Sequence, residues 1–191
     1  MKLILLLPTA AATAALFLAG CASKATYVDQ GSNKMITTVG KINIQDFERA
    51  ADEMVKSITD NLISPGKLKS GAPPEPALLA ISRIVNSTGQ QLETDLLVKK
   101  IRVALNRTGL VQTSTAIGLD GPEDPLVKSQ QHARLPDYSL SGKIIELKDN
   151  AGNVRQSSYI FQLTLSSKAG VGVWEEEKTI TKQGKRDAVG F

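Results

Sequence analysis

The first 20 residues constrain this chain most strongly, because they predict the compartment in which it has to fold. Lys2 supplies a positive charge, and residues 3–18 are almost wholly apolar, with Pro8 among them. No further charge occurs before Lys24. This layout is typical of a secretory signal peptide, and the apolar run is shorter than the ~20 residues of a membrane-spanning helix. We therefore expect residues 1–20 to direct export.

Leu18, Ala19, Gly20 and Cys21 end the apolar run and resemble the bacterial lipobox. Small residues give the signal peptidase access to the backbone, and the Cys thiol takes up a diacylglycerol. We therefore predict that Cys21 is lipidated and becomes the new N-terminus. Two or more acyl chains, palmitate among them, anchor a protein stably, whereas one does not. Ala22 follows, where an Asp would resemble an inner-membrane retention signal, so we expect the outer membrane, with the domain facing the periplasm.

The composition limits the folded part further. Cys21 is the only cysteine, so once it is lipidated no thiol remains for a disulfide, a metal site or catalysis. Residues 21–40 are polar and mixed, and predict a lipidated N-terminus with a flexible tether. Residues 41–191 suit one globular domain. The formal net charge of +4 is mild and does not indicate a nucleic-acid partner.

Two segments repeat apolar residues every three or four positions, which predicts amphipathic helices. The first runs from Asn43, a good N-cap, to Leu62. The second is capped by Thr94 and runs to about Thr108, with Gly109 in the position of a C-cap glycine. The apolar side of the second helix is expected to consist of Leu97, Ile101, Ala104 and Leu105.

The remaining segments predict strands. Ala77–Val85 is apolar almost throughout, which indicates a central strand covered on both faces. Leu110–Ala116 predicts a second strand, and Met35–Val39 a short one at the domain edge. The last third alternates apolar and polar residues, with turns at 150–153 and 169–170 and Trp174 in the final strand. We therefore predict an α/β (α+β) fold, a small mixed β-sheet with a C-terminal antiparallel meander, flanked by helices.

The sequence offers no catalytic constellation, so we expect no enzyme, no cofactor and no metal. His132 is the only histidine and lies in a polar segment, where a solvated side chain is favoured over a general base. Residues 118–125 form an acidic loop. Its spacing does not match an EF-hand, and its prolines favour a rigid turn over a calcium site.

Two charged features are candidates for partner binding. The basic candidates, on the second predicted helix, are Lys99, Lys100, Arg102 and Arg107. We expect Lys99 and Arg102 to point away from the apolar side and the other two to flank it. Such residues usually form a solvated face, but they can also contact an acidic partner or anionic headgroups. The acidic candidates, in the 118–125 loop, are Asp120, Glu123 and Asp124.

Six blocks of the sequence, taken in order, resemble a known family. They are Val39–Phe47, Ile81–Gly109, Ala116–Pro125, Pro136–Ile145, Tyr159–Ser167 and the run that starts at Trp174. Together they resemble the LpoB family of penicillin-binding protein activators. The resemblance covers most of the chain from Val39 onward, and it implies a small α/β domain.

The resemblance also implies a function. It points to an outer-membrane lipoprotein that docks on the accessory domain of a class A penicillin-binding protein, activates peptidoglycan synthesis and so influences cell shape. Members of the family can have long Pro-rich tethers, whereas the tether here spans at most ~70 Å. The alternative is a structural lipoprotein of a flagellar or other outer-membrane assembly. An envelope hydrolase ranks last, because the sequence shows no nucleophile–base pair.

Overall fold

The computed structural model describes residues 27–29, 32, 37–114 and 134–185. The chain divides into two units, Met1–Met35 and Ile36–Phe191, and the described helices and strands belong to the second. Of the predicted edge strand at Met35–Val39, the described residues 37–39 form no strand, and the rest lies outside the described ranges. None of the helices within those ranges has the length and apolarity needed to cross a membrane.

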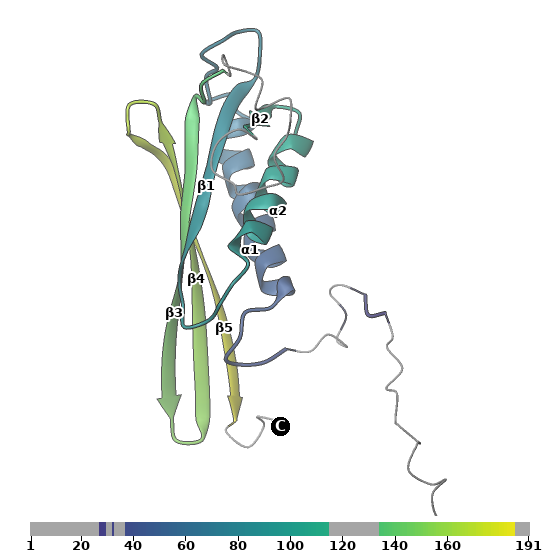
Figure 1. Cartoon of the computed structure of the whole chain (residues 1–191), viewed down its shortest axis with the longest axis vertical. Helices are drawn as coiled ribbons and strands as arrows, with labels where there is room; N and C mark the ends of the chain where they lie inside the picture. Colours follow the sequence, from purple (N-terminus) through teal and green to yellow (C-terminus); the bar gives the residue numbers. More distant parts are fainter. Residues whose placement is uncertain (1–26, 30–31, 33–36, 115–133, 186–191) are drawn as a thin grey trace, which may run out of the picture. The chain divides into compact units, whose positions relative to one another are not determined.

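Within its described residues, the second unit combines two α-helices with a five-stranded sheet. The order along the chain is α1 (Ile44–Ile58), a π-helical turn η1 (Thr59–Ile63), β1 (Ala77–Ser87), α2 (Thr94–Arg107), β2 (Val111–Thr113), β3 (Tyr138–Ala151), β4 (Val154–Ser167) and β5 (Gly172–Lys185). The strands lie in the order β2-β1-β3-β4-β5. β1 is parallel to β2 and β3, and β3, β4 and β5 form the antiparallel meander. The predicted α+β class is confirmed, and both helices lie on one face of the sheet (Figure 1).

Local signals set the ends of both helices. The Asn43 side chain accepts the backbone N–H of Asp46, whose carboxylate accepts the N–H of Asn43. Asn43 therefore caps α1 as predicted, and Asp46 completes a capping box. The predicted cap of α2 is wrong, because Thr94 is its first helical residue and Glu93 occupies the N-cap position. Gly109 follows the C-terminus of α2 with a φ of 68°, a conformation that favours glycine.

β1 is an internal strand, as predicted, but it is not covered on both faces along its whole length. Its first half is buried, whereas Ser82, Arg83 and Val85 are exposed. The two described helices pack on the same face of the sheet, so neither of them covers the side chains that alternate to the other face.

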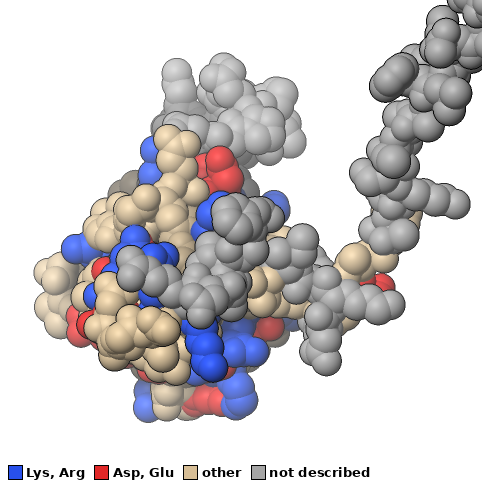
Figure 2. All heavy atoms as spheres, turned by 90° about the horizontal axis from the view of Figure 1, so that it is seen from below, with Lys and Arg blue, Asp and Glu red and all other residues tan. Residues whose placement is uncertain are grey.

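The β3–β4 hairpin extends past β1. β3 pairs with β1 only as far as Ile145, but it continues to Ala151 and pairs with β4 throughout. The end of β5 accompanies this hairpin, because Val154 at the start of β4 is registered with Lys185 at the end of β5. Figure 2 looks onto this end of the molecule and shows several Lys and Arg side chains across it.

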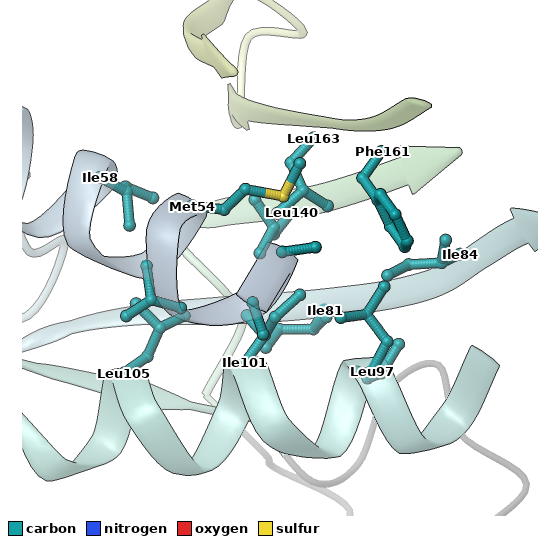
Figure 3. Packing of buried hydrophobic residues seen from close by; sticks show 14 of the residues in the cluster. Met54, Ile58, Ile81, Ile84, Leu97, Ile101, Leu105, Leu140, Phe161 and Leu163 are labelled. Carbon is teal, nitrogen blue, oxygen red and sulfur yellow. The ribbon is translucent and has the colours of Figure 1, made fainter. Parts of the chain in front are cut away.

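The core lies between the sheet and the two helices (Figure 3). Met54 and Ile58 of α1 and Leu97, Ile101 and Leu105 of α2 are all at most 1% exposed. The facing strands contribute alternate residues, among them Ile81, Ile84, Leu140, Phe161 and Leu163. Phe47 meets Phe161 edge to face, with ring centroids 6.1 Å apart. Trp174, expected in or over the core, is partly buried against it.

Candidate functional site

The basic residues of α2 do not share one surface. The inner side of the helix packs on the sheet, and it includes Val98, which is fully buried and was not expected on the apolar side. With Val98 included, the centre of the buried side is rotated around the helix toward Leu105. The predicted apolar side had its centre closer to Leu97. The four basic side chains are therefore distributed around the helix differently from the prediction.

Arg102 is the clearest correction. Predicted to point to solvent, it is only 8% exposed, since it follows Val98 by one helical turn and lies on the buried side. Its Nε and Nη2 atoms are buried and have no hydrogen-bond acceptor among the residues that the structure describes. Burial lowers the pKa of its guanidinium. Arg102 thus belongs to the packing of α2 and not to an open docking face.

Lys100 lies on the opposite side of α2, toward α1. Its Nζ donates to Oε1 of Glu48 at 2.7 Å, and both side chains are about three-quarters buried. This pair joins the two helices, so Lys100 is already engaged within the domain. Partly buried pairs of this kind are less screened by salt than surface pairs.

Lys99 and Arg107 are exposed, as predicted, and they share the outer side of α2 with two apolar residues that the sequence reasoning missed. Leu96 is 37% exposed, and Val103 is partly buried. The spacing of Leu96, Lys99, Val103 and Arg107 is three, four and four residues, which places them on one helical face. We call these four residues the α2 outer face. The sequence did contain a signal for this face, because Leu96 and Val103 are apolar, seven positions apart and off the predicted apolar side.

Two buried polar junctions hold α2 and the strands in place. In the first, the side chain of Gln90 accepts the N–H of Ile42 at 3.1 Å and donates to the hydroxyl of fully buried Tyr159 at 3.0 Å. Burial is the main cause that raises the pKa of Tyr159. Glu146 accepts the N–H of Gly89 at 3.0 Å. The segment that leads into α2 is therefore tied both to the start of α1 and to the sheet.

Asp137 is the second junction. Burial alone would raise its pKa, but hydrogen bonds from the Leu78 and Gly71 N–H groups and from Lys168, with the charge of Arg134, hold the pKa below its usual value. Its carboxylate lies 2.6 Å from Nη2 of Arg134 and 3.3 Å from Nζ of Lys168. This junction fixes the loop that precedes β1 against the start of β3.

Several predicted site residues lie outside the described ranges, so the structure neither places them nor tests their roles. They are Cys21, Asp120, Glu123 and Asp124. His132, predicted to be a solvated side chain and not a site residue, also lies outside these ranges. No group of three or more His, Cys, Asp or Glu side chains gathers to hold a metal ion within residues 27–29, 32, 37–114 and 134–185.

The comparison with known families decides the relationship. Residues 46–180 match the family described as peptidoglycan-synthase activator LpoB. The chain belongs to the LpoB family. The match begins within α1 and ends within β5, so it includes the α2 outer face, the Asp137 junction and the first junction except Ile42. The expected resemblance is confirmed, and the LpoB family is one of activators of peptidoglycan synthesis.

Solved structures similar to this LpoB-family chain are distant in sequence. The C-terminal domain of LpoB from Escherichia coli is 14% identical, with 71% of this chain and 98% of that domain covered and a TM-score of 0.44. The solution structure of E. coli LpoB is 16% identical, with 85% of this chain and 81% of that chain covered and a TM-score of 0.41. Lipoprotein GNA1162 from Neisseria meningitidis is 10% identical, with 57% of this chain and 85% of that chain covered and a TM-score of 0.41. No curated protein matches the sequence significantly.

Proposed function

We propose that this protein is an outer-membrane lipoprotein that binds a class A penicillin-binding protein on its periplasmic side and activates peptidoglycan synthesis. The observation that carries the proposal is the match to the LpoB activator family over residues 46–180. The predicted lipobox that ends at Cys21 supports the anchor, and Ala22 supports sorting to the outer membrane. The protein acts by binding and by favouring active conformations of the synthase, with no chemistry of its own.

The α2 outer face is the proposed docking site. It combines two apolar side chains, Leu96 and Val103, with two exposed cations, Lys99 and Arg107. In protein interfaces buried apolar anchors supply most of the affinity, and charges at the rim raise the association rate. A face of this composition suits an accessory domain with an apolar groove and an acidic rim.

The test is a purified polymerisation assay. The mature lipoprotein, in detergent, is added to its cognate class A synthase with a lipid-linked glycan precursor, and the rate of glycan polymerisation is measured. We expect the rate to rise several-fold, and we expect no release of fragments from peptidoglycan by the lipoprotein alone. An unchanged rate, together with recovery of a different envelope assembly in a pull-down, would instead favour the structural lipoprotein. Density-gradient fractionation of the membranes tests whether the lipoprotein is in the outer membrane. Its recovery with inner-membrane markers would contradict the proposed sorting to the outer membrane.

A further inference from the structure

The free end of the sheet, where the β3–β4 hairpin and β5 extend past β1, concentrates exposed basic residues. We call this the basic end and define it by the exposed side chains of Lys41, Lys148, Arg155 and Lys185. Register brings the strand ends that carry them together, because Arg155 is opposite Gly184 and Val154 is opposite Lys185. Lys185 shares the face of Val154, whereas Lys148 and Arg155 point to the other face of the hairpin. In the view along this end, Lys and Arg side chains lie across the face (Figure 2).

Acidic residues offset this charge only in part. Among the described residues of this end, Asp46 and Glu146 are buried in ion pairs, with Lys182 and Lys148 respectively. Asp149, in the hairpin, is the exposed acid. Glu146 offsets the charge of Lys148, and Asp149 offsets one more cation. Two of the four defining cations remain unbalanced, so the net charge of the basic end is positive.

The hairpin also exposes apolar side chains. Leu147 is 52% exposed and Val154 is 37% exposed. Both lie on the face of the hairpin opposite Lys148 and Arg155, because alternate residues of a strand point to opposite faces. Apolar side chains beside Lys and Arg are the composition by which a protein surface inserts shallowly among lipid headgroups.

The N-terminal segment enters the folded unit at this same end. Nζ of Lys182 donates to the carbonyl oxygen of Lys41 at 2.8 Å. Val39 packs directly on the backbone of Gly184. A Cβ added at Gly184 would lie 2.4 Å from Cγ2 of Val39. Cys21 precedes Val39 by about 18 residues, which span at most ~65 Å. A lipid at Cys21 would keep the basic end at high local concentration beside the membrane.

We infer that the basic end rests on the anionic phospholipid surface in which the protein is anchored, with the β3–β4 hairpin tip among the headgroups. The inference rests on the proposed lipidation of Cys21. In this orientation the β4–β5 turn at Ala169–Gly170, at the opposite end of β4, points away from the bilayer. The α2 outer face stays free at the side, and the short tether is long enough for the basic end to reach the bilayer.

The experiment places a fluorescent probe at either end of the mature lipoprotein. A lipidated Cys21 has no free thiol, so Asn153→Cys in the hairpin turn or Ala169→Cys in the opposite turn provides the only labelling site. Each is reconstituted into vesicles of phosphatidylethanolamine and phosphatidylglycerol that carry a headgroup quencher, and into phosphatidylcholine vesicles with the same quencher. We expect at least twofold stronger quenching at position 153 in the anionic vesicles, and none of this difference at position 169.

Charge reversal identifies the cause. Arg155→Glu with Lys185→Glu should reduce quenching at position 153 to the phosphatidylcholine level, since each cation near an anionic surface strengthens binding about fivefold. Lys67→Glu with Lys69→Glu makes the same change of charge in the loop before β1 and should have no effect. Lys41→Gln with Lys185→Gln is a milder second variant, for which an intermediate loss is expected, and circular dichroism verifies folding.

The outcomes separate this inference from the proposed anchor. If wild-type protein is labelled by a thiol reagent and leaves the vesicles, the anchor itself is absent. If the protein stays anchored but positions 153 and 169 are quenched equally, or the charge reversal changes nothing, the inferred orientation is overturned. If the charge-reversed variant no longer binds purified peptidoglycan sacculi but its quenching is unchanged, the basic end binds peptidoglycan and not the membrane. This result would also overturn the inferred orientation.

Discussion

Oδ2 of Asp137 accepts the backbone N–H of Leu78 at 2.9 Å, and this bond joins the start of β3 to the start of β1. Asp137 is only 6% exposed, and its other carboxylate oxygen accepts the N–H of Gly71 at 3.1 Å. One side chain thus orders two strands and the loop before them.

Replacement of Asp137 by Asn should lower the free energy of unfolding by about 2–3 kcal/mol, because buried donors lose a charged acceptor. Its pKa is lowered in the folded state. The carboxylate therefore stabilises the fold above its unfolded pKa, and this contribution disappears as pH falls through the folded pKa. Urea unfolding between pH 7 and pH 3, followed by Trp174 fluorescence, measures both effects.

A control distinguishes the buried carboxylate from its exposed neighbour. Glu75 also pairs with Arg134, at 2.9 Å, but it is 61% exposed. Glu75→Gln should change stability by less than about 1 kcal/mol. If Asp137→Asn were equally mild and kept the acid dependence of wild type, the junction would not have the role assigned to it.

Tyr159→Phe tests the other junction. The ring stays buried, but Gln90 loses the hydroxyl that accepts its Nε2 hydrogen bond, so we expect a loss of about 1 kcal/mol. The folded-state pKa of Tyr159 is raised, so wild type should lose stability as pH rises from the unfolded pKa through the folded one, and the variant should lack this component. Tyr159→Ala, which also empties the core, should cost about 3–5 kcal/mol. If Tyr159→Phe were as stable as wild type and kept the same loss of stability at high pH, the hydroxyl would not have the role assigned to it.

Arg102→Met should be neutral or stabilising by up to about 1 kcal/mol. The guanidinium is buried with two nitrogens that find no acceptor among the described residues, so an apolar side chain of similar length removes a desolvation cost. Arg102→Glu should instead destabilise the domain by several kcal/mol, and it cannot serve as a binding mutant. Thermal unfolding measures the stability of both variants relative to wild type, and Lys99→Met, at an exposed position, is the control. A marked loss in Arg102→Met would show that the guanidinium is satisfied.

The α2 outer face predicts two separable binding defects. Lys99→Glu with Arg107→Glu should slow association with the synthase accessory domain several-fold at low salt and reduce its salt dependence. Leu96→Ala with Val103→Ala should mainly speed dissociation, with about a tenfold loss of affinity. Surface plasmon resonance at two salt concentrations measures both. Arg49→Glu with Lys67→Glu, exposed elsewhere, is the matched control, and wild-type kinetics in both test variants would exclude this face.

Cys21→Ala should leave an uncleaved and unlipidated precursor, because the thiol that takes up the diacylglycerol is gone. Metabolic labelling with a fatty-acid probe checks this directly. Cys21→Ser, which keeps a side chain of similar size without the thiol, should behave in the same way. Label incorporation by either variant would disprove lipidation at Cys21.

Much of the fold could be predicted because its signals are local. Asn43 caps α1 through a bond to a residue three positions away, and Gly109 ends α2 because its φ is positive. The alternation of apolar and polar residues identified all three strands of the meander and their turns. Such features need only the neighbouring chain, so spacing reveals them before any tertiary contact is known.

Long-range packing decided what the sequence could not. Arg102 lies inside because α2 rotates to bury Val98, and a helical pattern alone does not set that rotation. Asp137 and Gln90 become junctions only when segments more than 45 residues apart meet. The basic end exists because β3, β4 and β5 are in register past the end of β1, so that cations far apart in the sequence meet at one end of the sheet. Register and helix rotation depend on the whole core, and no local segment of the chain contains that information.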